Sequence, residues 1–154
     1  MNNKQKTYPL LLNQLKALLE NEHDMIANFS NASALLFHSL ENINWAGFYL
    51  LKNDELLLGP FQGKVACMHI PLNKGVCGIC ASTREIQRVD DVHKFPGHIA
   101  CDCASNSEIV IPLIKKDTLL GVLDIDSYKF SNFDEVDEYY LMQFCEILIN
   151  SLNS

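Results

Sequence analysis

Apolar residues recur at helical spacing near both ends of the chain. Lys4 to Glu20 and Asp24 to Leu40 each carry an apolar stripe, formed by Leu11, Leu15, Leu18 and Leu19 in the first segment and by Met25, Phe29, Ala32, Leu36 and Leu40 in the second. Phe133 to Asn150 repeats the pattern through Val136, Tyr140, Phe144 and Ile147. Apolar side chains three and four residues apart share one face of a helix, so three amphipathic helices are predicted.

Between these helices the pattern changes to alternation. Strands are expected at 43–52, 55–58, 65–70, 86–90, 108–114 and 118–126, with turns at Asn53-Asp54 and around Lys116-Asp117. The small-residue segment 75–81 is a candidate short helix. Residues 91–107 form a long loop carrying His93, His98, Cys101 and Cys103. Loops of this length in compact domains usually serve a function.

This order of elements predicts an α+β fold in a single domain, residues 1–154. The sheet is expected to be mostly antiparallel, with helices packed on one face and a ligand pocket under loops on the other. With 154 residues, the chain is long enough for one substantial core.

Strand alternation also selects side chains that share a face. Trp45, Gly47 and Tyr49 lie on one face of their strand, where the glycine could leave a gap walled by rings. Asp124 and Asp126 share a face of the last strand, and Glu108 begins the neighbouring strand. Clustered acids can bind an ammonium group, hold a metal or donate a proton. Core packing of the rings and a solvated hairpin edge are the structural alternatives.

The charge balance argues against some partners. Nineteen acids against twelve bases give a formal net charge of −7, which disfavours nucleic acid and anionic membranes. The sequence contains neither an apolar run long enough for a membrane span nor a recognisable signal peptide. We therefore expect a cytoplasmic protein.

Six cysteines exceed what a cytosolic core needs. In a reducing compartment, clustered cysteines more often indicate metal binding or redox chemistry than structural disulfides. Cys77-x2-Cys80 followed by Cys101-x-Cys103 approaches a zinc spacing, but the second pair is one residue short. Cys77 begins the predicted short helix, whose dipole would lower a thiol pKa. Cys67 falls on a predicted strand, and Cys145 is interpreted as a core residue.

Four strings give the most specific signal in the sequence. They are Gly59-Pro-Phe-Gln-Gly-Lys-Val-Ala-Cys67, Gly75-Val-Cys77-Gly, Asp90-Asp-Val-His-Lys-Phe-Pro-Gly-His-Ile-Ala-Cys101-Asp and Ala104-Ser-Asn-Ser-Glu108-Ile-Val. These strings closely resemble the free methionine-R-sulfoxide reductases, which are GAF-fold enzymes. The similarity extends through Asn44-Trp45-Ala-Gly-Phe-Tyr49 and Gly121-Val-Leu-Asp124-Ile-Asp126-Ser127. A GAF domain alone is a weak functional signal, but the three cysteines within these strings are specific. The departures from the family pattern are Cys80 and Cys103.

The resemblance implies roles for these residues. Cys101 would be the catalytic cysteine, Cys67 the principal resolving cysteine and Cys77 a third redox-active partner. Trp45 and Tyr49 would wall the methyl-sulfinyl end of the substrate, and Glu108, Asp124 and Asp126 would form the polar side of its pocket. Selectivity for the R epimer and for the free amino acid is implied by the resemblance alone.

The chemistry suits these residue types. A thiolate attacks the sulfoxide sulfur while an acid protonates the oxygen, and the resulting sulfenic acid condenses with a second thiol. A dithiol such as thioredoxin would reduce the disulfide, and no metal or bound organic cofactor is required. The family leans towards homodimers. The rival interpretations are a non-catalytic GAF module that senses a small molecule or redox state, and a thiolate zinc-binding module.

Overall fold

The computed structural model describes residues 3–97 and 104–153. The chain order of its elements is α1 (Asn3–Leu19), α2 (Met25–Ser39), β1 (Ile43–Lys52), β2 (Glu55–Gly63), β3 (His69–Pro71), α3 (Gly75–Thr83), β4 (Gln87–Val89), the 3₁₀ turn η1 (Val92–Lys94), β5 (Ser107–Lys115), β6 (Thr118–Ser127) and α4 (Glu135–Asn150). His98, Cys101 and Cys103 lie outside the described residues.

One six-stranded sheet organises the fold, with the order β3-β2-β1-β6-β5-β4 and antiparallel pairing throughout. Two-residue turns join β1 to β2 and β5 to β6. Asn53, Asp54, Lys116 and Asp117 all have positive φ, as a type I′ turn requires. Both turns were expected from the sequence.

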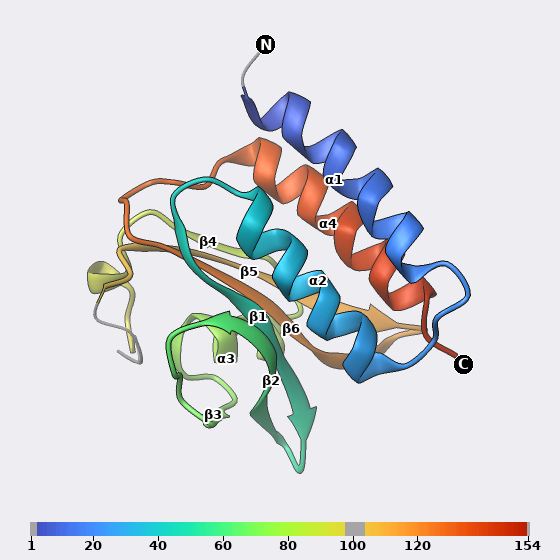
Figure 1. Ribbon diagram of the computed structural model, residues 1–154. Coiled ribbons are helices and arrows are strands. Elements are labelled where there is room, and N and C mark those ends of the chain that lie inside the picture. Colours follow the sequence, from blue (N-terminus) through green and yellow to red (C-terminus); the bar gives the residue numbers. More distant parts are fainter. Residues whose placement is uncertain (1–2, 98–103, 154) are drawn as a thin grey trace.

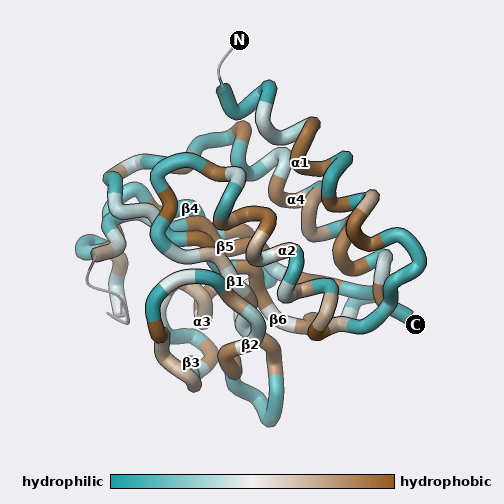
Figure 2. The backbone as a smooth tube through the Cα atoms, in the orientation of Figure 1, coloured by the Kyte–Doolittle hydropathy of each residue, from teal (hydrophilic) through white to brown (hydrophobic). Residues whose placement is uncertain are grey.

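Helices α1, α2 and α4 cover one face of this sheet (Figure 1). The hydrophobic residues coloured brown in Figure 2 gather where these helices meet the strands. The large fully buried side chains of this core include Tyr8, Phe29, Phe48 and Phe144. The α+β fold is confirmed, with one addition. Helix α3 packs on the opposite face, against a second apolar cluster that contains Trp45, Tyr49 and Val110.

Several predicted boundaries are wrong, for identifiable reasons. The strand expected at 55–58 extends to Gly63, because β1 continues to pair with it as far as Trp45. The strand expected at 65–70 is only His69–Pro71. The Lys64 and Cys67 carbonyls accept hydrogen bonds from the Trp45 and Tyr49 side chains, and bonding to β2 begins only at the Met68 carbonyl, which accepts from the Leu58 N–H. The last helix begins at Glu135, not Phe133. Asp134 caps it in a capping box, accepting from the backbone of Asp137 while the Asp137 carboxylate accepts from the Asp134 N–H.

Buried polar contacts join the two ends of the chain. Tyr8 Oη donates to Asp137 Oδ1 at 2.6 Å, and Lys4 Nζ donates to Asp137 Oδ2 at 2.5 Å. Asp137 is itself buried. These bonds attach α1 to α4, so the helical layer is fixed by a polar network as well as by apolar packing.

Candidate active site

Three central strands place the candidate residues in rows across one face of the sheet. Asp126 on β6 pairs with Trp45 on β1 and with Glu108 on β5, so these three side chains form one row. Asp124 pairs with Gly47 in the adjacent row, and Tyr49 pairs with Val122 in the row after it. The alternation in the sequence therefore grouped Trp45 with Tyr49 and Asp124 with Asp126 correctly, and the strand register adds Glu108 and places all five on one face.

The carboxyl groups on this face are removed from solvent. Glu108 is 7% exposed and Asp124 is 5% exposed, while Asp126 is half-buried. Burial, followed by the nearby charges of Asp124 and Asp126, raises the pKa of Glu108 well above its ordinary value of 4.5. Hydrogen bonds from Glu108 to both aspartates act in the same direction. Burial and the two neighbouring aspartates therefore favour the protonated form of Glu108.

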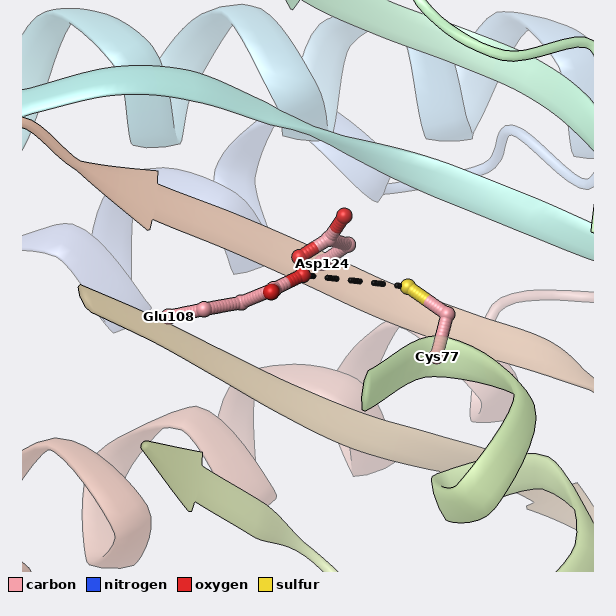
Figure 3. A group of neighbouring side chains, drawn as sticks. All are labelled: Cys77, Glu108 and Asp124. Carbon is pink, nitrogen blue, oxygen red and sulfur yellow. Dashed lines mark hydrogen bonds between the residues drawn. The ribbon is translucent and has the colours of Figure 1, made fainter. Parts of the chain in front are cut away.

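Cys77 approaches this acid cluster from α3. Figure 3 shows its thiol directed towards Glu108 and Asp124, and Cys77 Sγ donates to Glu108 Oε2 at 3.9 Å. Cys77 does lie in the first turn of α3, as expected, but the lowered thiol pKa predicted for it is wrong. Burial and the carboxylates raise its pKa well above the ordinary value, because both penalise a thiolate more than the helix dipole stabilises one.

The aromatic residues form a continuous wall beside the acids. The ring centroids of Trp45 and Tyr49 lie 5.9 Å apart and those of Trp45 and Phe61 lie 5.1 Å apart, both pairs stacked. The open gap expected at Gly47 is absent from this described stretch. A Cβ there would lie 2.2 Å from Phe61 Cβ and 2.9 Å from Trp45 Cη2, so the glycine admits the rings themselves. Phe61 was not identified from the sequence, although it lies within one of the matching strings.

Polar atoms of this wall hold the segment that carries Cys67. Trp45 Nε1 donates to the Lys64 carbonyl at 3.1 Å, and Tyr49 Oη donates to the Cys67 carbonyl at 2.9 Å. Burial, with added effects of Asp124 and Cys77, raises the pKa of Tyr49, which keeps its hydroxyl available as a donor. Cys67 is half-buried and takes part in a disulfide.

The remaining described cysteines are free and buried. Cys80 Sγ donates weakly to the Val110 carbonyl at 3.7 Å, and burial, with a smaller effect of Asp124, raises its pKa to about 12. Cys145 lies in the core of the helical layer, as its position in the sequence predicted. Cys80 therefore serves as a small apolar residue of the second cluster, which the sequence alone did not reveal.

A metal could use one group of side chains among the described residues. Ligand atoms of Cys77, Glu108 and Asp124 all lie within 4.8 Å of one another. Metal binding requires deprotonated ligands, whereas Cys77 and Glu108 both have raised pKa values. Cys80 is not part of this group, so the Cys77-x2-Cys80 spacing does not form half of a zinc site. The raised pKa values of Cys77 and Glu108 therefore suit this group to holding a proton better than to binding a metal ion.

The loop that leads to Cys101 is anchored at both ends. The Val92 N–H donates to the Asn106 carbonyl at 2.9 Å, and the Asn106 N–H donates to the Ser127 carbonyl at 2.7 Å. The His93 ring bonds to Asn106 Oδ1 at 2.9 Å, which gives this histidine a structural role. These contacts attach the loop to the end of β6 that carries Asp126.

Across the described part of the chain, every helix is too short or too polar to cross a membrane.

Comparison with known proteins gives a consistent result. A family model described as a GAF domain matches residues 28–150. Protein YtsP of Bacillus subtilis is 55% identical over 151 residues, which cover 97% of this chain and 93% of that protein. The free methionine-R-sulfoxide reductase of Escherichia coli is 53% identical over 141 residues, which cover 92% of this chain and 86% of that protein.

A solved structure agrees at the level of the whole fold. The free methionine-R-sulfoxide reductase of Neisseria meningitidis, in complex with its substrate, superposes with a TM-score of 0.93 at 39% identity, covering 98% of this chain and 90% of that one. Sequence and fold thus agree over almost the full length, and this chain belongs to the GAF domain family and, within it, to the free methionine-R-sulfoxide reductases.

Proposed function

We propose that this protein reduces free methionine-R-sulfoxide to methionine by thiol chemistry. The observation that carries the proposal is the buried Glu108, whose raised pKa keeps it protonated beside Asp124 and Asp126, next to an aromatic wall. A sulfoxide needs a proton donor at its oxygen, and its methyl group needs an apolar surface. Membership of the reductase family, with a relative in complex with its substrate, supports the same reaction.

The first step requires a thiolate and an acid. The Cys101 thiolate attacks the sulfoxide sulfur while Glu108 donates its proton to the oxygen. The oxygen, now a hydroxyl group, passes from the substrate sulfur to the Cys101 sulfur while the bond between the two sulfurs breaks. Methionine leaves and Cys101 becomes a sulfenic acid, so the Cys101 sulfur is oxidised by two electrons and the substrate sulfur is reduced by two. Glu108 is the proposed donor because burial and the neighbouring Asp124 and Asp126 raise its pKa.

Substrate binding divides between the two sides of the site. The carboxylates of Asp124 and Asp126 attract the ammonium group of the free amino acid, since opposite charges interact strongly where water is excluded. The Trp45 and Tyr49 rings, whose centroids are 5.9 Å apart, pack against the methyl-sulfinyl end. Preference for the free amino acid follows from the ammonium contact, because a peptide-bound residue has no such charge.

Cys67 completes the cycle by resolving the sulfenic acid. Its thiol attacks the Cys101 sulfur, water leaves, and a disulfide forms. Two observations support this assignment: Cys67 takes part in a disulfide, and Cys77, Cys80 and Cys145 are all free. A redox role for Cys77 stays a prediction, and its raised pKa argues for slow attack by that thiol. Thioredoxin then returns both cysteines to thiols.

The cellular setting is proposed on the resemblance and the residue chemistry. Cysteines that must return to thiols require a reducing compartment, which favours the cytoplasm. A homodimer is proposed because the family leans towards one. The reaction as written uses thiols and carboxyl groups of this chain and needs no resident metal or organic cofactor.

The test supplies free methionine-R-sulfoxide, thioredoxin, thioredoxin reductase and NADPH to reduced, metal-free protein. We expect substrate-dependent oxidation of NADPH, with little or none when the S epimer replaces the R epimer. Cys101→Ser should abolish even a single turnover. Cys67→Ser should release about one methionine per protein and then stall without a small thiol, because the sulfenic acid has no resolving partner. Absence of substrate-dependent NADPH oxidation in the unmodified protein would refute the proposal, and normal turnover by Cys67→Ser would assign resolution to another cysteine.

A further inference from the structure

The segment that carries Cys67 has two inward and two outward side chains. Ala66 and Cys67 pack against the second apolar cluster. Val65 and Met68 on either side of them are 88% and 68% exposed. Val65 is the most exposed large apolar side chain among the described residues. Folding has therefore left two apolar groups in water at the chain positions that flank Ala66 and Cys67, and Cys67 takes part in a disulfide.

This exposure is imposed by the backbone and is not the result of a loosely held loop. The Lys64 carbonyl accepts from Trp45 Nε1 at 3.1 Å, and the Cys67 carbonyl accepts from Tyr49 Oη at 2.9 Å. The Met68 carbonyl accepts from the Leu58 N–H at 2.9 Å. The carbonyls of Lys64, Cys67 and Met68 therefore attach the segment to the sheet at three points. The Trp45 and Tyr49 side chains that supply two of these bonds are buried.

Polar groups border these two residues. The exposed Lys64 precedes Val65, and His69, which pairs with Glu55 through its Nδ1 at 2.6 Å, follows Met68. An exposed apolar patch with a polar border is typical of a protein-interaction site. Two side chains offer far less area than a stable dimer needs, whereas redox encounters use the smallest interfaces. The patch therefore suits a transient partner that must reach the adjacent sulfur.

We propose that Val65 and Met68, here named the Cys67 patch, are the docking surface for the dithiol protein of the thioredoxin class that reduces the Cys67 disulfide. This inference rests on the proposed function for the origin of that disulfide. A thiolate of the partner attacks Cys67 Sγ, which forms a mixed disulfide and releases the other cysteine as a thiolate that takes up a proton. The partner's second thiol then displaces Cys67. Two electrons pass to this chain, and the partner ends as a disulfide.

The docking surface can be tested without any sulfoxide. The protein is first oxidised to form the Cys67 disulfide, then mixed with reduced thioredoxin, and the second-order rate of disulfide reduction is measured. Val65→Ser/Met68→Ser should lower this rate about tenfold, as expected when a small docking interface loses its apolar contacts. Reduction by dithiothreitol, which needs no docking surface, should proceed at the wild-type rate.

A matched variant controls for the loss of exposed apolar area. Ile26 and Met142, on α2 and α4, are 69% and 51% exposed, and Ile26→Ser/Met142→Ser should leave both rates unchanged. An unaltered thioredoxin rate in the Cys67 patch variant would overturn the proposal. Equal slowing by dithiothreitol would also overturn it, because the substitutions would then act on the disulfide itself. Conversion of a dimer to a monomer by the patch variant in light scattering would identify a second copy of this chain as the occupant.

Failure of the proposed function gives a different result. In that case the protein would release no methionine from the sulfoxide, yet the reduction rates of the oxidised protein could still be compared between the variants. The surface and the activity are therefore decided by separate measurements.

Discussion

Glu108→Gln tests the role of the buried acid most specifically. Glutamine has nearly the same shape and can still donate a hydrogen bond to a sulfoxide oxygen, but it cannot give up a proton. Ligand oxygens of Glu108 and Asp124 lie within 4.8 Å of each other. Two unit charges at 4.8 Å and an effective dielectric constant of ~20 repel by about 3.5 kcal/mol. The protonated form of Glu108 is thus strongly preferred, and the substitution removes the proton that this preference retains.

The kinetic consequence should appear in the chemical step. Loss of a positioned general acid typically lowers a rate by about 10²–10⁴-fold. We expect the single-turnover release of methionine to slow by about this factor, while KM changes by only a fewfold because the hydrogen bond to the oxygen remains. In the wild type this rate should fall as pH rises through the raised pKa of Glu108, and the variant should lack that decline.

Glu108→Gln should slow catalysis but raise the free energy of unfolding. A carboxyl group with a raised folded-state pKa contributes stability below its unfolded-state pKa and loses that contribution as pH rises through the folded-state value. Glu108→Gln does not ionise, so its free energy of unfolding should exceed that of the wild type by a margin that grows with pH. Urea titrations at several pH values measure this margin. Rapid single turnover by the variant, or a margin independent of pH, would refute the assignment of Glu108 as the protonated acid.

Three further experiments test other parts of the structure. Asp137→Ala should lower the free energy of unfolding by about 2–4 kcal/mol, because it leaves the buried Tyr8 hydroxyl without its 2.6 Å acceptor; adding Tyr8→Phe should recover part of this loss, and a purely additive double mutant would contradict the coupling. Gly47→Ala should lower stability by about 1–3 kcal/mol and raise KM for the sulfoxide, since its Cβ would lie 2.2 Å from Phe61 Cβ; wild-type stability and KM would show that the wall tolerates displacement. The Cys77 thiol should react slowly with iodoacetamide in the reduced folded protein, as its raised pKa requires, and rapid labelling of Cys77 detected by mass spectrometry would contradict this.

Much of the fold could be predicted because its local signals agree. The β1 strand has the predicted bounds, and both type I′ turns fall at the expected dipeptides. Alternation also correctly puts Trp45 and Tyr49 on one face of β1, and Asp124 and Asp126 on one face of β6. A period of two is sufficient for that inference, since it needs only neighbouring residues.

The features that were missed depend on contacts between distant segments. The pKa of Cys77 is raised by carboxyl groups on β5 and β6, which a helix-dipole argument from local sequence does not include. Similarly, residues 65–67 are apolar enough for a strand, but the Trp45 and Tyr49 side chains of β1 bind the Lys64 and Cys67 carbonyls in place of a strand partner. Cys80 looked like a metal ligand by its spacing and proves to be a buried apolar contact, because its thiol reaches the Val110 carbonyl across α3 and β5.

The central claim is that reduced thiols of this chain transfer electrons to free methionine-R-sulfoxide. The most direct measurement mixes reduced, metal-free protein with each epimer of free methionine sulfoxide, without any other reductant, and quantifies methionine by chromatography. The account predicts about one methionine per protein from the R epimer, with formation of a disulfide at Cys67, and none from the S epimer or from Cys101→Ser. Release of no methionine from the R epimer by protein whose thiols are shown to be reduced would contradict it.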